Sequence, residues 1–189
     1  MKRLSIFVSG NGTNLQRIAE YFAHNQEVEI ANVVCNNPKA YAIERAKNLG
    51  IPLRMITKQD FNSEAFVEEL QSLGVDLIVL AGFLWKVPEA LIKAFPKRIV
   101  NIHPALLPKY GGKGFYGEHV HEAVVAAREA QSGITVHYVN EIYDSGEIIL
   151  QARVALKEGE TPDSLAAKIH QLEQAYFPVA IEQVLFSQN

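Results

Sequence analysis

The sequence predicts an α/β fold: a three-layer, mostly parallel twisted sheet with helices on both faces and an antiparallel extension of strands toward the C-terminus. Short β-rich runs alternate with helical segments as far as residue 102, and this alternation is typical of parallel sheets. The apolar runs at residues 4–8, 30–34 and 77–81 are continuous, which indicates strands that are covered on both faces.

The first part of the chain supplies five predicted strands and the helices between them. The strands are expected at residues 4–9, 30–35, 52–56, 76–81 and 99–102. The helices, with apolar residues at helical spacing, are expected at about 15–22, 40–49, 63–73 and 88–95. Gly50 and Gly74 directly follow two of these helices, where glycine commonly ends a helix.

The character of the chain changes after residue 103. Residues 104–117 hold two prolines and four glycines and are expected to form a loop, followed by a helix at 118–130. Residues 134–139 and 148–154 have the alternating pattern of two strands, which are joined through a turn. A last helix is expected to begin at Thr161-Pro162. No internal repeat or interdomain linker is visible, so we expect a single domain over residues 1–189.

The amino-acid composition argues against several classes of function. The chain has 189 residues, a formal net charge of −3 and a pI near 6.1, so there is no overall attraction for nucleic acid or an anionic membrane, and neither is an expected partner. No apolar stretch approaches the roughly 20 residues that cross a bilayer. The one cysteine, Cys35, ends an apolar run and is expected to be a buried thiol, and no Cys/His spacing predicts a metal site. With no signal peptide visible, these features favour a cytoplasmic protein.

The first segment with chemical character is Ser9-Gly10-Asn11-Gly12-Thr13-Asn14, which follows the first strand and opens the first helix. Free backbone N–H groups and a partial positive charge at a helix N-terminus favour an anion there, and glycine permits close approach. The segment is neither the dinucleotide motif nor the Walker motif, so a phosphate monoester is favoured. The alternative is a tight turn in which Thr13 caps the helix.

The second segment, Asn101-Ile102-His103-Pro104, ends a predicted central strand, where open α/β sheets bind ligands. Asn101 and His103 are two residues apart and therefore face the same side. An asparagine amide can donate to a developing oxyanion, and a histidine can transfer protons near neutral pH. The alternative is a core histidine bonded to backbone, with the asparagine closing a turn.

The third segment, Asp144-Ser145-Gly146, lies in the turn between the last two strands. Asp144 is either a surface turn residue or a carboxylate that reaches His103, raises its pKa and holds the ring in position. Among the other histidines, His119 and His121 are candidates for lining a substrate site, and His137 for the core or a pocket wall. His24 and His170 are expected at the surface.

Together these segments resemble the folate-dependent glycinamide ribonucleotide formyltransferases of purine synthesis. The resemblance spans almost the whole chain and rests on four runs: S-G-N-G-T-N at 9–14, D-L-I-V-L-A-G-F at 76–83, N-I-H-P-A-L-L-P-K-Y at 101–110, and G-I-T-V-H-Y-V with D-S-G-E-I-I-L-Q between 133 and 151. It implies a Rossmann-like formyltransferase fold. It also implies transfer of the formyl group of 10-formyltetrahydrofolate to the amine of glycinamide ribonucleotide in IMP biosynthesis, by direct amine attack and a tetrahedral intermediate.

The resemblance implies a role for each matching residue. Asn101 and protonated His103 would stabilise the oxyanion, and Asp144 would support His103 and help move the proton through water. Gly12, Thr13 and Asn14 would hold the substrate phosphate, and Glu173 the ribose hydroxyls. The folate, a co-substrate, would lie along Leu84, Trp85, Lys86 and Val87, near Asn101 and against the backbone that leads into Asp144. No metal is expected, and the assembly would be a monomer or a weak homodimer.

The sequence departs from the family pattern at three places: Ala105 replaces a usual serine, Trp85 and Lys86 differ beside the folate, and residues 111–117 form a longer, glycine-rich loop, a candidate mobile lid. A formyltetrahydrofolate deformylase is expected to carry an extra N-terminal domain and histidine in place of Pro104. A methionyl-tRNA formyltransferase is expected to carry a C-terminal RNA-binding domain and a basic surface. A phosphate-binding protein that reuses the fold is the non-enzymatic alternative.

Overall fold

The computed structural model describes residues 1–187 and has seven strands in one sheet, in the order β3-β2-β1-β4-β5-β6-β7. The pairs β1–β2, β1–β4 and β2–β3 are parallel, whereas β6–β7 is antiparallel, so the predicted fold class is confirmed. The chain divides into two compact units. The N-terminal unit holds Met1–Val100 and the end of the chain from Ile181, and the second unit holds Asn101–Ala180. The single domain remains a prediction.

The sheet of the N-terminal unit is built from apolar strands. They are β1 (Lys2–Val8), β2 (Val28–Cys35), β3 (Leu53–Met55) and β4 (Leu77–Leu80), and β5 (Ile99–His103) begins in this unit. All four residues of β4 and the last five of β1 are buried, as their continuous apolar runs predicted. Cys35 is fully buried at the end of β2, as a free thiol.

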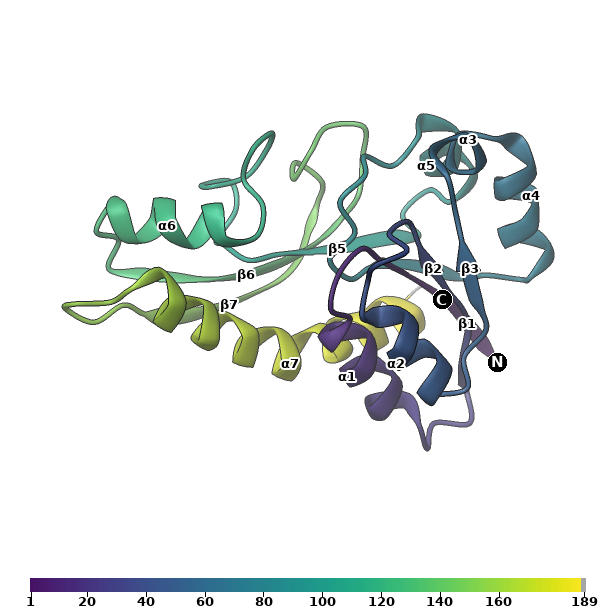
Figure 1. Cartoon of the computed structure of the whole chain (residues 1–189), viewed down its shortest axis with the longest axis horizontal. Helices are drawn as coiled ribbons and strands as arrows, with labels where there is room; N and C mark the ends of the chain where they lie inside the picture. Colours follow the sequence, from purple (N-terminus) through teal and green to yellow (C-terminus); the bar gives the residue numbers. More distant parts are fainter. Residues whose placement is uncertain (188–189) are drawn as a thin grey trace. The chain divides into compact units, whose positions relative to one another are not determined.

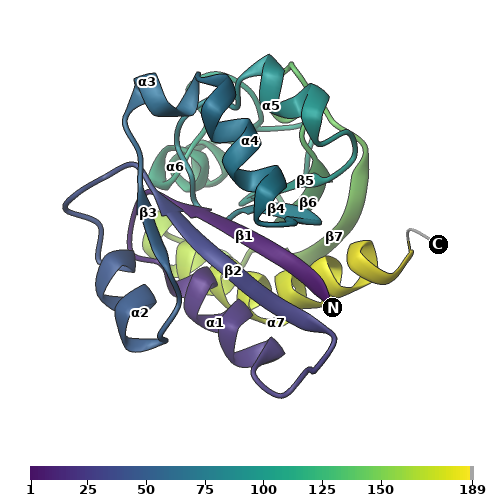
Figure 2. The ribbon, with the colours of Figure 1, turned by 90° about the vertical axis from the view of Figure 1, so that its right-hand side faces the viewer.

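Helices cover both faces of this sheet (Figure 2), with α1 and α2 on one side and α4 and α5 on the other. The helices are α1 (Thr13–Phe22), α2 (Ala42–Asn48), α3 (Lys58–Phe61), α4 (Glu64–Ser72) and α5 (Glu89–Ala94). The four-residue α3 was not predicted, because it is too short to show a helical period. Its signal was the capping box, in which Thr57 and Asp60 bond each other's backbone N–H groups.

Loops that follow the parallel strands β1 and β4 meet at one edge of the N-terminal unit. The backbone N–H of Leu84 donates to Ser9 Oγ at 2.9 Å, and the N–H of Ser9 donates to the carbonyl of Gly82 at 3.2 Å. The side-chain amide of Asn37, which follows β2, donates to the carbonyl of Ser9 at 3.0 Å. Three loops that carry polar residues are thereby held together at the carboxyl ends of their strands.

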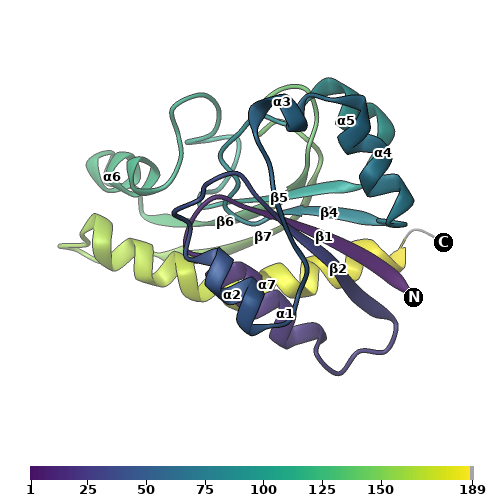
Figure 3. The same ribbon diagram turned by 45° about the vertical axis from the view of Figure 1, so that its right-hand side comes forward.

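The second unit pairs β6 (Gln131–Tyr138) with β7 (Ile148–Ala155). In Figures 1 and 3, α6 (Glu118–Ala126) lies on one side of this pair and the first part of α7 (Pro162–Ser187) on the other. A Cβ at Gly133 would lie 1.9 Å from the carbonyl oxygen of Ala152, so only glycine permits this close pairing. Thr161 caps α7 by accepting from the N–H of Ser164, as predicted.

Two boundaries in the second unit differ from the prediction. The helix α6 ends at Ala126 rather than at residue 130, because Arg128 adopts a left-handed φ of 52° that terminates the helix. The strand β6 consequently begins three residues earlier than expected, at Gln131. Of the helices within residues 1–187, none has the length and apolar character required to span a bilayer.

Candidate active site

The glycine loop after β1 turns sharply into α1. Gly12 is the residue before the helix and has a left-handed φ of 79°, and a Cβ there would lie 2.7 Å from Ala42 Cβ. Gly12 occupies the cap position of α1, and Thr13 is the first helical residue, so Thr13 is not the cap. Glycine has no side-chain acceptor for the helix N–H groups. The tight turn of the alternative interpretation is present, and the cap residue Gly12 makes no side-chain bond to the first turn of α1.

Arg45 from α2 holds this loop in place. Its Nε donates to the carbonyl of Asn11 and its Nη2 to Asn11 Oδ1, both at 2.8 Å. The guanidinium also lies 5.0 Å from the centre of the Tyr41 ring. A cation directly behind the loop favours an anionic ligand in front of it. The phosphate-binding role of Gly12, Thr13 and Asn14 stays a prediction.

His103 stands at the end of β5, and both of its ring nitrogens face defined groups in the second unit. Nε2 lies 2.6 Å from the carbonyl oxygen of Tyr110. Because a carbonyl can only accept, we assign the hydrogen of the neutral ring to Nε2. Nδ1 then carries the lone pair and lies 3.6 Å from Asp144 Oδ2. The predicted approach of Asp144 to His103 is confirmed by this distance.

Asp144 is fixed by the glycine-rich loop and by an unusual backbone conformation. Its Oδ2 accepts from the backbone N–H of Gly112 at 2.9 Å. Asp144 and Tyr110, the two residues that flank the His103 ring, both have left-handed φ values, 52° and 55°. Such conformations are unfavourable for residues with a Cβ and gather where function requires a particular geometry. The turn around Asp144 is also tight, because a Cβ at Gly146 would lie 1.6 Å from the carbonyl oxygen of Tyr138.

His137 contacts two of these side chains, those of Asn101 and Asp144. The sequence analysis left open whether His137 lies in the core or in a pocket wall. Its Nδ1 lies 3.0 Å from the carbonyl oxygen of Tyr138, so Nδ1 carries the hydrogen and Nε2 is the acceptor. Asn101 Nδ2 donates to this Nε2 at 3.3 Å, and Asp144 Oδ1 lies 3.6 Å from the same atom. The sequence signal was weak: a polar residue in an otherwise apolar strand.

Burial and charge act in opposite directions on these groups. Burial lowers the pKa of His103 and His137 adds to that effect, while the Asp144 carboxylate and the Tyr110 carbonyl oppose it; the net pKa lies below 6.5. Burial alone would raise the pKa of Asp144. Contacts with His137, His103 and the N–H of Gly112 outweigh burial and leave the pKa of Asp144 below its ordinary value. The site thus favours a neutral imidazole beside an ionised carboxylate, whereas the family resemblance implied a protonated His103.

This arrangement can perform acid–base chemistry on a group that becomes an oxyanion. The Asn101 amide has two hydrogens, and one is used by His137, so the second can donate to a ligand. His103 can take a proton on Nδ1 and become an imidazolium held between a carboxylate and a carbonyl. In the described part of the chain, no group of three or more His, Cys, Asp or Glu side chains has the arrangement of a metal site.

The segment at residues 84–87 follows β4 in the N-terminal unit. Leu84 is exposed and Val87 is buried. Trp85 joins an aromatic cluster, with its ring centre 5.8 Å from that of Phe61 and 6.1 Å from that of Phe83. The cluster fixes the indole and leaves Leu84 as an apolar surface. The folate-binding role of Leu84, Trp85, Lys86 and Val87 stays a prediction.

The remaining sequence candidates lie in different environments. Glu173 Oε2 lies 3.7 Å from His170 Nδ1 on α7, and its ribose-binding role stays a prediction. His24, His119 and His170 are exposed. His121 is buried, and burial lowers its pKa; its Nδ1 has no hydrogen-bond partner among the described residues.

Comparisons with known proteins agree with this geometry. Residues 2–181 match the Formyl transferase family. Phosphoribosylglycinamide formyltransferase of Bacillus subtilis is 35% identical over 195 residues, covering 100% of this chain and 97% of the relative. A crystal structure of glycinamide ribonucleotide transformylase 1 from Symbiobacterium toebii is similar with a TM-score of 0.89 at 34% identity, over 100% of this chain and 89% of that one.

The chloroplastic phosphoribosylglycinamide formyltransferase of Arabidopsis thaliana is 39% identical over 186 residues, which are 94% of this chain. The chain spans 64% of the length of that relative and 60% of the chloroplastic relative from Vigna unguiculata. The family match nevertheless extends over nearly all of the chain and includes both units. This chain belongs to the Formyl transferase family.

Proposed function

We propose that this chain transfers the formyl group of 10-formyltetrahydrofolate to the amine of glycinamide ribonucleotide, in purine biosynthesis. The observation that carries the proposal is that Asn101, His103 and Asp144, which are distant in the sequence, are close in space. Asp144 lies next to His103, and His137 contacts both Asp144 and Asn101. The likeness to phosphoribosylglycinamide formyltransferases over the full length of the chain supports the same substrates.

In the first step, the lone pair of the substrate amine attacks the formyl carbon and forms a C–N bond. The formyl oxygen becomes an oxyanion, and the free hydrogen of the Asn101 amide donates to it. His137 accepts the other hydrogen of that amide, so it orients the donor. Fixed donors of this kind act on charge that develops in the transition state, and loss of one typically costs about 3–4 kcal/mol of barrier.

In the second step, the attacking nitrogen loses a proton to His103 Nδ1. The resulting imidazolium is held by Asp144 on one side and by the Tyr110 carbonyl on the other. Nδ1 and the carboxylate oxygen are 3.6 Å apart, so the carboxylate stabilises the charge of the imidazolium directly, and a water beside the pair is a suitable relay for the proton. The C–N10 bond then breaks, and N10 of the folate takes the proton, which gives tetrahydrofolate and the N-formyl product.

The binding groups are assigned as the family resemblance implies. Gly12, Thr13 and Asn14 hold the phosphate, supported by the uncapped first turn of α1 and by Arg45 behind the loop. Glu173 binds the ribose hydroxyls, and Leu84 to Val87 bind the folate together with Asn101. No step of this mechanism uses a metal.

We also propose that the protein is cytoplasmic and acts as a monomer or a weak homodimer, without a nucleic-acid partner. The single, buried, unpaired thiol of Cys35 suits a reducing compartment. Sedimentation at increasing protein concentration tests the assembly, because a weak dimer gives a concentration-dependent mass whereas a tight dimer contradicts the proposal.

A formyl-transfer assay tests the activity. The purified protein is mixed with 10-formyltetrahydrofolate and glycinamide ribonucleotide, and folate absorbance and product mass are followed together. We expect tetrahydrofolate and formylated product in equal amounts, and much slower transfer to glycinamide that lacks the ribose phosphate. Release of formate without an acceptor amine would indicate a deformylase instead, and the absence of transfer would refute the proposal.

A further inference from the structure

Three residues of the second unit hold a left-handed backbone although they are not glycine. They are Tyr110, Arg128 and Asp144, with φ values of 55°, 52° and 52°. Such conformations are unfavourable for a residue with a Cβ and persist only where the surrounding structure holds them. Tyr110 and Asp144 flank the His103 ring, whereas Arg128 lies at the end of α6. A side chain that connects Arg128 with Tyr110 would join all three to one site.

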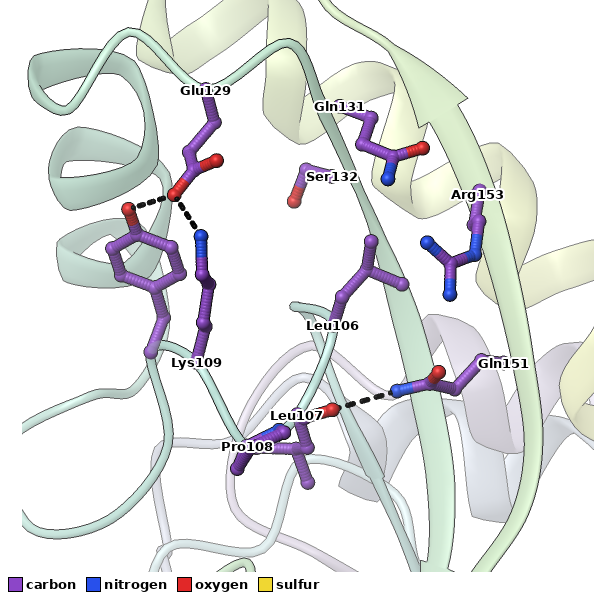
Figure 4. Close-up of a pocket in the computed structure, with 10 residues that line it drawn as sticks. Leu106, Leu107, Pro108, Lys109, Glu129, Gln131, Ser132, Gln151 and Arg153 are labelled. Atoms are coloured by element: carbon purple, nitrogen blue, oxygen red, sulfur yellow. Dashed lines mark hydrogen bonds and ion pairs between the residues drawn. The ribbon is translucent and has the colours of Figure 1, made fainter.

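Glu129 is that side chain. It follows the left-handed Arg128 and therefore lies between the end of α6 and the start of β6. The Tyr110 hydroxyl donates to Glu129 Oε1 at 2.8 Å, and Lys109 Nζ donates to the same oxygen at 3.0 Å (Figure 4). Lys109 and then Tyr110 lower the pKa of Glu129, so its carboxylate is ionised near neutral pH. Burial and Glu129 raise the pKa of Tyr110, so the hydroxyl keeps its hydrogen and donates it.

The two donors to Glu129 differ in what they hold. The Lys109 side chain is 69% exposed, and an ion pair of such a side chain contributes little. The Tyr110 hydroxyl makes a charge-assisted bond that is partly buried and joins segments 19 residues apart. The ring of Tyr110 also packs edge-on against Phe115, with the ring centres 6.1 Å apart. The bond between Tyr110 and Glu129 is therefore the contact that ties the two segments together.

Tyr110 transmits this contact to His103. Its backbone carbonyl accepts the hydrogen of His103 Nε2 at 2.6 Å, while its hydroxyl is bound by Glu129. A strained residue relaxes by rotating its φ and ψ, and such a rotation would turn the carbonyl away from the imidazole. We propose that Glu129 is a positioning residue for His103, because it holds the side chain of Tyr110 and thereby the carbonyl that orients the imidazole ring.

The Tyr110 carbonyl determines which nitrogen of the neutral His103 ring carries the hydrogen. With the hydrogen on Nε2, the lone pair is on Nδ1, which lies 3.6 Å from Asp144. A looser carbonyl would allow the other tautomer, whose Nδ1 already carries a hydrogen and cannot accept a proton. The effect of Glu129 on turnover rests on the proposed role of His103 in formyl transfer, whereas its effect on the His103 ring does not.

The test is NMR of the intact protein without substrates, in which two-bond ¹H–¹⁵N correlations report the tautomer and the pKa of His103. Tyr110→Phe removes the hydroxyl and keeps the ring, and Glu129→Ala removes the acceptor. We expect both variants to raise the fraction of the Nδ1–H tautomer several-fold. Both should also lower the pKa of His103, because the Tyr110 carbonyl raises it. Lys109→Met is the matched control, because it removes the exposed donor to the same carboxylate and should leave both properties unchanged.

Asp144, His137 and His121 also interact with the charge of His103, and all three are retained in every variant. Wild-type tautomer and pKa in both Tyr110→Phe and Glu129→Ala would overturn the positioning role, and so would an equal change in Lys109→Met. The double variant should resemble either single variant, since both remove one contact, and additive effects would overturn the shared route. If Glu129→Ala does not fold, Tyr110→Phe alone decides between these outcomes.

The kcat of formyl transfer distinguishes the positioning role from the proposed function. We expect Tyr110→Phe to lower kcat roughly tenfold with little change in KM, and to move the acidic limb of the rate profile to lower pH. An altered tautomer with unchanged kcat would mean that Glu129 positions His103 but that His103 takes no part in the transfer. A lower kcat with unchanged His103 signals would refute the positioning role and leave the proposed function intact.

Discussion

Asp144→Asn removes the negative charge of one carboxylate and nearly preserves the shape of the side chain. Asparagine keeps a side-chain oxygen that can accept from the N–H of Gly112, as Asp144 Oδ2 does at 2.9 Å. The change removes the negative charge that faces His103 Nδ1 at 3.6 Å. The variant should therefore remain folded while its imidazolium loses the opposite charge that stabilises it.

The distance gives the size of the effect. Two unit charges 3.6 Å apart interact by about 332/(20 × 3.6), or about 4.6 kcal/mol, at an effective dielectric constant of about 20. That dielectric constant suits this pair, because the two side chains are only 5% and 10% exposed. A loss of about 4.6 kcal/mol corresponds to a rate about three orders of magnitude lower.

The assay is kcat/KM for formyl transfer by the wild type and Asp144→Asn, with urea unfolding to verify the fold. Since Asp144 raises the pKa of His103, its loss lowers that pKa further, and the acidic limb of the rate profile should move to lower pH. Glu141→Gln is the matched control, because it removes an exposed carboxylate from the same loop. Near-normal turnover by Asp144→Asn, or an equal loss in Glu141→Gln, would refute the reasoning.

Four further changes test other parts of the structure. Gly12→Ala should abolish binding of the ribonucleotide phosphate, because the new Cβ meets Ala42 at 2.7 Å on a left-handed backbone; normal substrate affinity by calorimetry would contradict this. Gly146→Ala should lower the free energy of unfolding by roughly 2–4 kcal/mol in urea and displace Asp144, because its Cβ would lie 1.6 Å from the Tyr138 carbonyl oxygen; Ser145→Ala in the same turn is the control. His137→Phe should lower turnover roughly tenfold or more without unfolding, because the Asn101 amide loses its acceptor, and an unchanged kcat would argue against its orienting role. Burial lowers the pKa of both His103 and His121 below 6.5, so the unfolded chain takes up protons before the folded chain as the pH falls. The free energy of unfolding should therefore decrease as the pH falls below about 6.5, and His121→Phe should make this decrease less steep. A midpoint of urea unfolding that does not depend on pH would contradict the prediction.

The alternating pattern was enough to predict the architecture, because hydrophobic periodicity and helix-ending glycines are local properties. Continuous apolar runs predicted the buried strands β1 and β4, and Thr161-Pro162 predicted the start of α7. The predictions that were wrong also concerned local features. The helix α3 is too short for a period, and the left-handed Arg128 ends α6 early at a residue type that gives no such warning.

For the candidate site, the sequence determined which residues have suitable chemistry, namely Asn101 and His103 two apart on one strand and Asp144 in a turn. The tertiary structure decided that Asp144 reaches His103, that the Tyr110 carbonyl takes the Nε2 hydrogen, and that His137 orients Asn101. The register of β6 against β7 shifts between Val136 and His137, so strand alternation does not give the direction of that ring. Contacts between residues tens of positions apart depend on register, turn conformation and packing of the whole chain, and these are not properties of any local segment.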